Sequence, residues 1–184
     1  MSRLVKIALL AGFASSQMTY AQCPEGGGFV SVNTNGNPGG MISWGAELGY
    51  QRVGEQTVTV PYIGEGTYVC RGASLADDVA VLSRSYIGND VLLAKGVMVG
   101  EDVRLDEGVI INSGSVVSNN VKIGSKTFVG SNSLIAKGAQ VGQAVSIGAF
   151  VKIGEYAVVE DSARIENYVH VPPNSIVEAG EVRM

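Results

Sequence analysis

The side chain best suited to catalysis in this sequence is His170, the single histidine among 184 residues. An imidazole takes a proton from a hydroxyl or an amine near neutral pH, which is general-base chemistry. Lys152 lies eighteen residues earlier, and these two residues are the candidate catalytic groups. The alternative interpretation is a surface histidine without a catalytic role, because no insertion interrupts residues 63–177 to build a substrate cleft.

The small numbers of histidines and cysteines limit which metal sites and which disulfides the chain can form. One histidine cannot supply a three-histidine zinc site. The carboxylates of Glu160, Asp161 and Glu178 fall near one corner, and we interpret them as solvated like charges rather than calcium ligands, so no metal is expected. Cys23 and Cys70 are the two cysteines. A disulfide between them is the prediction for an exported chain, with lipidation of Cys23 or two free thiols as alternatives.

The element that must position these groups is a repeat of six residues. A bulky aliphatic residue recurs at every sixth position twenty times, with Pro, Thr, Ala, Ser or Val two residues before it. Gly, Asn or Asp is common at the intervening corners, where tight turns and positive φ are needed. The twenty aliphatic residues are Ile63, Val69, Leu75, Val81, Ile87, Leu93, Val99, Leu105, Ile111, Val117, Ile123, Val129, Ile135, Val141, Ile147, Ile153, Val159, Ile165, Val171 and Val177.

A period of six fits neither a helix nor an isolated strand, but it fits a short strand followed by a corner. Three such units close a triangular coil of eighteen residues, and coils stack by parallel pairing about 4.8 Å apart. The sequence therefore predicts an all-β fold, a single-stranded parallel β-helix of six to seven coils over residues 63–180. General rules for parallel crossovers favour a right-handed connection.

The pattern of a small residue, any residue, Ile, Leu or Val, and then Gly, Ala, Asp or Glu resembles the hexapeptide-repeat superfamily. That resemblance implies a left-handed β-helix, which reverses the general rule, and a homotrimer. Val171-Pro172-Pro173-Asn174-Ser175 is similar to the last coil of hexapeptide acetyltransferases. Such enzymes use a histidine in a cleft between subunits, with a loop that projects from the coils and acetyl-CoA as the cofactor. Carbonic anhydrases of this fold hold zinc through three histidines, which this chain lacks.

The outward residues one position before each bulky aliphatic residue divide into three faces, because every third hexad falls on the same side of the prism. Two faces have apolar centres, which on a soluble protein mark an interface. The first face carries Tyr62, Ala80, Met98, Val116, Leu134, Lys152 and His170; the second carries Tyr68, Tyr86, Arg104, Lys122, Gln140, Val158 and Ile176; the third carries Ser74, Leu92, Ile110, Phe128, Ser146 and Arg164.

We expect Met98, Val116 and Leu134 on the first face, with Leu92, Ile110 and Phe128 on the third, to be the interface of a cyclic homotrimer. Two apolar faces that share an edge allow each subunit to contact both neighbours. The alternative is that these residues reflect the ordinary preference of strands for bulky apolar side chains.

The first 21 residues have the features of a signal peptide, with a basic start, a short apolar stretch and small residues before the end. We predict cleavage after Ala21 and export to the periplasm or the exterior. Cleavage removes Arg3 and Lys6 and changes the net charge from −4 to −6. An acidic chain of this kind is not expected to bind nucleic acid, and no later stretch is long and apolar enough to span a bilayer.

The remaining segments are a lead-in and a short tail. Residues 22–62 interrupt the hexads and are rich in Gly and Asn, so we expect a loop that caps the open end of the first coil, with a ligand-binding loop as the alternative. Residues 181–184 form the tail. The sequence favours a non-enzymatic structural or interaction protein of the envelope or exterior without a cofactor. The alternative is an acyltransferase-like enzyme, dependent on acyl- or acetyl-CoA, with an inter-subunit site near His170.

Overall fold

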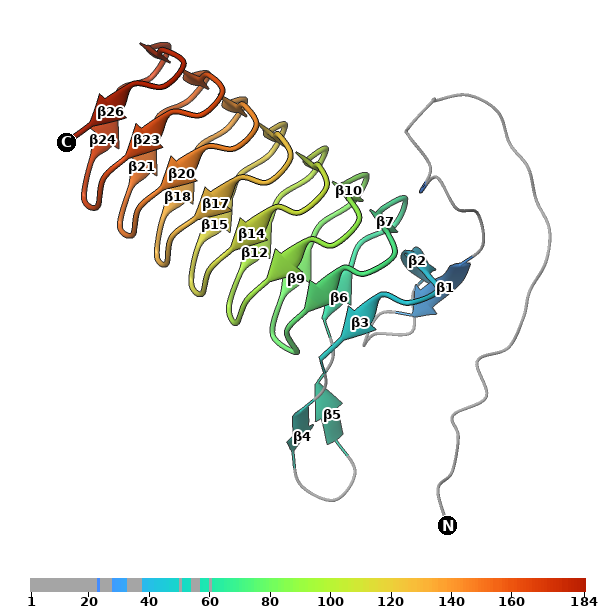
Figure 1. Ribbon diagram of the computed structural model, residues 1–184. Helices are drawn as coiled ribbons and strands as arrows, with labels where there is room; N and C mark the ends of the chain where they lie inside the picture. The colour runs from blue at the N-terminus through green and yellow to red at the C-terminus, as the bar shows by residue number, and fades with distance from the viewer. Residues whose placement is uncertain (1–22, 24–27, 33–37, 50, 54–56, 60) are drawn as a thin grey trace.

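The computed structural model describes residues 23, 28–32, 38–49, 51–53, 57–59 and 61–184, and in these ranges the chain is built from strands and turns (Figure 1). The described part contains no helix long and apolar enough to cross a membrane. The predicted signal peptide and its cleavage after Ala21 lie outside the described residues. They stay predictions.

Three parallel sheets form the faces of a left-handed β-solenoid of about seven turns, which confirms the predicted fold. The first face consists of β6 (Tyr62–Ile63), β9 (Ala80–Val81), β12 (Met98–Val99), β15 (Val116–Val117), β18 (Leu134–Ile135), β21 (Lys152–Ile153) and β24 (His170–Val171). The second face consists of β2 (Pro38–Ser43), β7 (Tyr68–Val69), β10 (Tyr86–Ile87), β13 (Arg104–Leu105), β16 (Lys122–Ile123), β19 (Gln140–Val141), β22 (Val158–Val159) and β25 (Ile176–Val177), with β1 (Gly28–Val32) antiparallel to β2.

The third face runs across the front of Figure 1 from β3 to β26. From β8 onward, each outward residue of this face lies directly beside the one eighteen residues further along the chain. The strands are β3 (Glu47–Leu48), β8 (Ser74–Leu75), β11 (Leu92–Leu93), β14 (Ile110–Ile111), β17 (Phe128–Val129), β20 (Ser146–Ile147), β23 (Arg164–Ile165) and β26 (Val182–Arg183).

The solenoid begins earlier than the sequence pattern indicated. Ile42 pairs with Val69 and Leu48 pairs with Leu75, so both belong to a coil that precedes Ile63. The fifteen-residue step from Leu48 to Ile63 is one hexad plus nine extra residues. These include a hairpin of β4 (Gln51–Val53) and β5 (Thr57–Thr59). The expected frame break is therefore an insertion at one corner, after which the register resumes.

The solenoid also continues further at its C-terminal end. β26 pairs with β23, with Arg164 beside Val182, so residues predicted to be a tail extend the third face. Glu181 accepts a hydrogen bond from the backbone N–H of Glu178 and pairs with Arg183, and these contacts lower the pKa of the Glu181 carboxyl.

The core is a single apolar column inside the three faces. All twenty predicted inward aliphatic residues are buried, each no more than 4% exposed. Burial of a Val, Leu or Ile side chain contributes about 1.5–3 kcal/mol before chain entropy is counted. The column and the ladder of backbone hydrogen bonds between successive coils therefore stabilise the fold along its whole length.

Five buried hydroxyl groups also connect successive coils. The Ser133 hydroxyl donates to the Gly148 carbonyl at 2.9 Å and accepts from the Val151 N–H at 3.0 Å. Each hydroxyl thus satisfies a backbone group that the corner leaves unpaired, which would be costly in a dry core. Thr67, Ser85, Ser115, Thr127 and Ser133 all occupy the inward position two residues before a core aliphatic residue.

Candidate functional site

His170 and Lys152 lie side by side on the first face. β24 pairs with β21 in parallel, and His170 is the direct partner of Lys152 in that register. Both side chains point outward and are exposed. The eighteen-residue spacing predicted this arrangement because three hexads complete one coil. The catalytic role of the two residues remains a prediction.

The outward side chains of the third face change from apolar to polar at the same coils. Ser146 and Arg164 occupy its outward positions there, next to each other across β20 and β23. The Arg164 guanidinium pairs with the Glu166 carboxylate at 2.6 Å on the exposed surface. Polar side chains thus occupy both faces around the edge that precedes β21 and β24.

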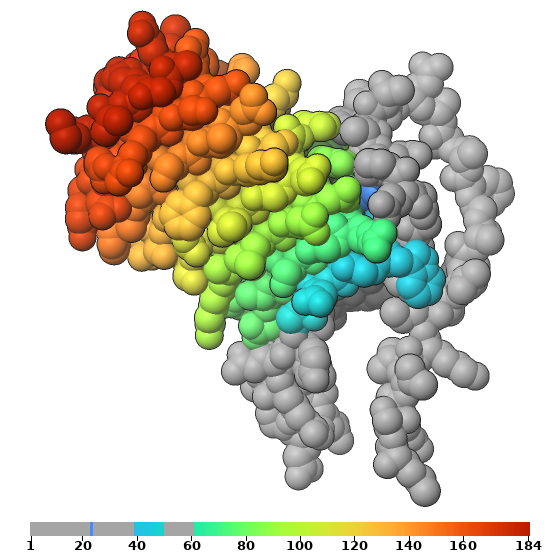
Figure 2. Space-filling view, in the orientation of Figure 1, coloured from blue at the N-terminus to red at the C-terminus, as the bar shows by residue number. Residues whose placement is uncertain are grey.

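The coils before them carry the apolar residues that the sequence assigned to an interface. Met98, Val116 and Leu134 are consecutive partners on the first face, and Leu92, Ile110 and Phe128 are consecutive partners on the third. Met98 is 54% exposed, and Leu92, Ile110 and Phe128 are each about 40% exposed. The third face runs as an unbroken surface from the green coils to the red ones (Figure 2). Exposed apolar residues at these adjacent positions form a contiguous patch.

The edge between the third and first faces has a feature that sequence reasoning missed. Phe150 and Tyr168 stack with ring centroids 5.1 Å apart and planes 3° apart. Each is the third residue of its corner. Both adopt the left-handed backbone conformation, with φ of 58° and 64°, and both are exposed. The equivalent corner positions earlier on this edge are the small or polar residues Gly96, Gly114 and Asn132. The sequence pattern predicted Gly, Asn or Asp at corners. A comparison of equivalent corner positions eighteen residues apart would have revealed the two rings.

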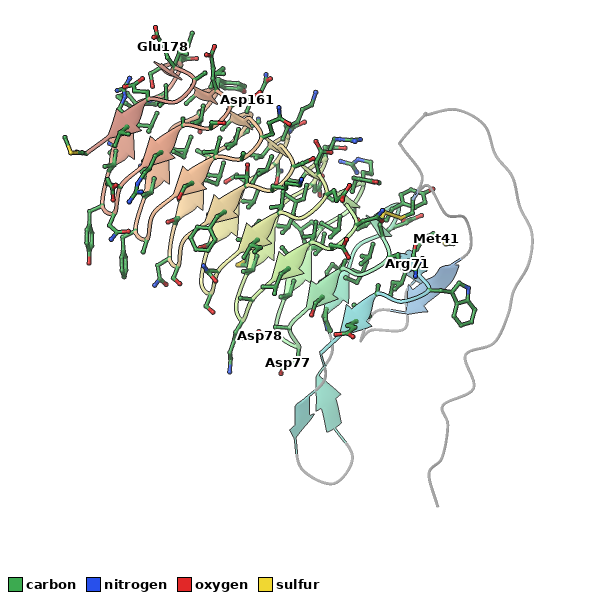
Figure 3. The ribbon with its side chains drawn as sticks, in the orientation of Figure 1. Met41, Arg71, Asp77, Asp78, Asp161 and Glu178 are labelled. Atoms are coloured by element: carbon green, nitrogen blue, oxygen red, sulfur yellow. A yellow bond between two sulfur atoms is a disulfide. The ribbon has the colours of Figure 1, made fainter. Side chains whose placement is uncertain are left out.

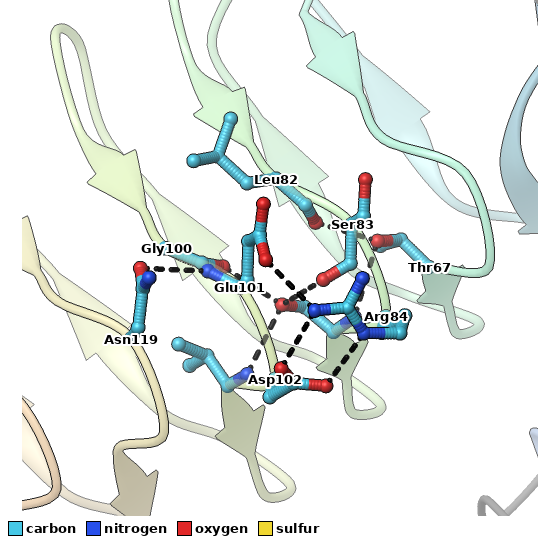
Figure 4. A network of polar contacts seen from close by, with 10 residues as sticks. Thr67, Leu82, Ser83, Arg84, Gly100, Glu101, Asp102 and Asn119 are labelled. Atoms are coloured by element: carbon cyan, nitrogen blue, oxygen red, sulfur yellow. Dashed lines mark hydrogen bonds and ion pairs between the residues drawn. The ribbon is translucent and has the colours of Figure 1, made fainter.

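Ion pairs join two neighbouring corners of the edge between the first and second faces (Figure 4). Arg84 forms a two-pronged contact with Asp102 at 2.9 and 2.8 Å and a further contact with Glu101 at 2.7 Å. The hydrogen bond from Arg84 lowers the pKa of the Asp102 carboxyl, and both carboxylates raise the pKa of the Arg84 guanidinium. Asn119 accepts the Glu101 N–H at 3.0 Å. These contacts join three successive corners of this edge.

A hollow of about 380 Å³ lies on the second face, away from His170. Lys122, Gln140 and Val158 form its floor, and residues of the next corner form its rim. The rim carboxylates already serve the corners, since Glu160 accepts the Ala179 N–H and Asp161 accepts the Gln143 N–H. We therefore place the candidate site at His170 and not in the hollow.

The acidic corner and the cysteines occupy a different edge from the candidate site. Asp161 and Glu178 lie on the upper edge of Figure 3, whereas Asp77 and Asp78 lie on the lower edge, from which the hairpin leaves. In the described part of the chain no three His, Cys, Asp or Glu side chains are grouped as metal ligands. Cys23 and Cys70 are joined in the structure with Cα atoms 5.3 Å apart.

The β4–β5 hairpin projects from the first corner of the edge between the third and first faces (Figure 1). Its neighbour β6 and the His170 strand β24 stand at opposite ends of the seven-stranded first face. Six steps of about 4.8 Å separate them by about 29 Å. The hairpin is therefore too far from His170 to cover it.

Comparison with known proteins agrees with this geometry. The model of the family described as bacterial transferase hexapeptide (six repeats) matches residues 84–119. Together with the three stacked parallel sheets, this match confirms the resemblance to hexapeptide-repeat proteins with a left-handed β-helix. A comparison with curated protein sequences returned no match.

Solved structures of acyl-transferring proteins share the fold. A candidate acetyltransferase from Bacillus cereus is 17% identical, with 63% of this chain and 74% of that chain covered and a TM-score of 0.57. The UDP-N-acetylglucosamine O-acyltransferase of Moraxella catarrhalis is 12% identical, with 79% and 63% covered and a TM-score of 0.52. The acetyltransferase domain of a Neisseria gonorrhoeae protein, solved with acetyl coenzyme A, is 21% identical, with 69% and 54% covered. Its TM-score of 0.37 is too low to transfer a cofactor site.

These findings overturn the interpretation of the chain as a non-enzymatic structural or interaction protein. The matched family is one of transferases, and the solved structures named above are described as acetyl- or acyltransferases. The low identities establish the fold, and the activity of this chain is therefore a proposal. The findings favour the alternative, an acyltransferase-like enzyme.

Proposed function

We propose that this protein is an acyltransferase of the hexapeptide-repeat type, active as a homotrimer, with its site between subunits at His170. The observation that carries the proposal is the direct pairing of Lys152 with His170 at the coils where the outer surface changes from apolar to polar. The matched transferase family and the acyl-transferring relatives support the reaction class.

The shape of a triangular prism provides a cleft without an inserted loop. Each subunit is a triangular prism with an angle of about 60° at the edge that faces the threefold axis. Three such edges occupy about half of the full turn, so the faces of neighbouring subunits diverge from that edge at about 60°. The gap widens with distance from the shared edge, and outward side chains bridge it where it approaches the separation of about 10 Å at which sheets pack. Apolar outward residues can meet across such a gap. The absence of a loop within residues 63–177 therefore does not argue against a substrate cleft.

In this arrangement, the first face of one subunit lies opposite the third face of its neighbour. Met98, Val116 and Leu134 then meet the neighbour's Leu92, Ile110 and Phe128, which removes the exposed apolar patch from water. One and two coils further on, Lys152 and His170 lie opposite Ser146 and Arg164 of the neighbouring subunit. The outward side chains here are polar and do not draw the faces together, so the cleft stays open at this height, and Lys152 supplies a positive charge that attracts an anion.

The basic side chains suit an acyl donor that carries phosphate groups, such as acetyl-CoA. Lys152 would hold its phosphates through charge-assisted hydrogen bonds, and the neighbour's Arg164, whose Nε pairs with Glu166, would add its remaining guanidinium N–H groups. The bound donor supplies a thioester, which is an activated acyl group. His170 accepts the proton of an acceptor hydroxyl or amine, and the acceptor oxygen or nitrogen forms the new bond to the acyl carbon. The bond from that carbon to sulfur breaks, and the leaving thiolate takes the proton from His170.

Release of the coenzyme A thiol from acetyl-CoA, measured with a panel of hydroxyl and amine acceptors, tests this proposal. We expect His170→Asn to lower kcat by about 100- to 10,000-fold, because it removes the general base. Lys152→Ala should mainly raise the KM for acetyl-CoA. Lys122→Ala is the matched control, since Lys122 is an exposed lysine at the same strand position on the second face. Unchanged turnover in His170→Asn would remove His170 from the reaction.

A further inference from the structure

The stacked rings of Phe150 and Tyr168 occupy the edge between the third and first faces, beside the candidate site. Tyr168 precedes His170 by two residues and Phe150 precedes Lys152 by two residues. Both rings are exposed, at 51% and 75%. Large exposed aromatic side chains on an isolated chain leave apolar area in contact with water.

The backbone conformation at these two corners does not favour aromatic residues. Phe150 and Tyr168 adopt positive φ, a conformation that is strained for bulky side chains and easy for Gly or Asn. Gly96, Gly114 and Asn132 occupy the same position on the three preceding coils. The two rings stack on each other, yet each stays more than half exposed, so further contact would remove apolar area from water.

The position of the rings complements the apolar patch. Where the two faces are apolar, up to Phe128 and Leu134, the shared edge carries small or polar residues. Where the faces become polar, from Ser146 and Lys152 onward, the edge becomes aromatic. Apolar contact surface is therefore continuous along the chain, but it moves from the faces to the edge at the coils that hold the candidate site.

We propose that Phe150 and Tyr168 form an aromatic lock, in which the ring pairs of three subunits pack together on the threefold axis. The lock would hold the subunits at the height where the faces must stay apart to admit substrate. Burial of the rings on assembly then offsets the backbone strain. This inference rests on the trimer of the proposed function and assigns a positioning role to two residues that do not touch the reacting atoms.

The double variant Phe150→Asn/Tyr168→Asn tests the lock, because Asn is compatible with positive φ and should not impair folding. We expect its trimer to dissociate at a protein concentration at least about 100-fold higher than that of the unmodified protein, as is common when central aromatic anchors are removed. Sedimentation over a dilution series measures this value. The melting temperature of the dissociated chain should stay equal or rise, since strain is relieved.

Tyr156→Asn is the matched control. Tyr156 is also an exposed aromatic residue with positive φ, but it lies at the corner between the first and second faces, against Gly138. Its replacement should leave dissociation unchanged. As an independent measurement, Tyr168→Cys should form disulfide-linked dimers between subunits on mild oxidation, whereas Tyr156→Cys should not.

Dissociation of the double variant equal to that of the unmodified protein would overturn the lock, as would a monomeric unmodified protein. A double variant that stays trimeric but loses ADP binding would show that the rings stack on a nucleotide base instead. Loss of the trimer in the double variant, together with full turnover in His170→Asn, would keep the lock and reject the proposed catalytic site.

Discussion

The coils from Leu92 to Leu134 and the coils from Ser146 to Ile176 have the same interior and different exteriors. Inside, both bury one aliphatic residue per hexad to the same extent. Outside, the earlier coils present apolar side chains on two faces, and the later coils present Lys152, Arg164 and His170 there. Because inward and outward residues alternate along each strand, the two surfaces vary independently. The inside therefore determines the fold, and the outside determines what each coil contacts.

The largest expected effect comes from placing charge in the apolar region. Ile110→Lys/Phe128→Lys should dissociate the trimer, because a buried unpaired charge costs about 3–5 kcal/mol or more than a hundredfold in affinity. Ser146→Lys, on the same face in the polar region, is the control and should leave the trimer intact. Light scattering at one protein concentration separates the two. A stable trimer in the first variant would show that these residues are ordinary surface.

A second test asks whether the interiors are equivalent. Ile123→Ala, in the earlier coils, and Ile165→Ala, in the later coils, should each lower the free energy of unfolding by about 2–5 kcal/mol, because each leaves a cavity in the buried column. Both residues are 1% exposed. Guanidinium unfolding measures the loss. Costs that differ by more than a factor of two would show that the two regions differ inside as well.

A third test concerns the junction between the regions. Ser133 accepts the Val151 N–H and donates to the Gly148 carbonyl, so its hydroxyl joins an apolar coil to the first polar one. Ser133→Ala should lower the free energy of unfolding by about 1–3 kcal/mol, because two buried backbone groups lose their partner. Ser146→Ala, which alters an exposed hydroxyl, should have little effect in the same unfolding experiment. Equal costs for the two variants would contradict the role of the buried hydroxyl.

The smallest effect is the dependence of stability on pH at the edge of the earlier coils. Arg84 lowers the pKa of Asp102 in the folded state, so the pair stabilises the fold at pH values above the ordinary pKa of Asp. This contribution is lost as the pH falls through the lowered pKa. The exposure of the pair makes the effect slight and sensitive to salt. Thermal melting of Asp102→Asn against the unmodified protein from pH 2 to pH 7 should show a difference that disappears at the acidic end.

The sequence predicted the solenoid and the pairing of His170 with Lys152 because an uninterrupted period of six sets both the coil and the residue beside each position. It did not predict the coil that contains Ile42 and Leu48, because nine extra residues concealed a register that the structure preserves. It also did not predict the stacking of Phe150 on Tyr168, since corner propensities favour Gly and Asn. A contact between corners eighteen residues apart depends on side chains that the repeat leaves unspecified.

The insertion between Leu48 and Ile63 has a consequence for how proteins of this shape can change. Nine residues leave the prism at a corner and return without altering the pairing of the coils on either side. A corner is therefore a position where the chain can lengthen while every strand keeps its partner. A segment added at the same edge five or six coils later would stand over His170, so a single insertion could give the cleft a lid and narrow its choice of acceptor without any change in the core.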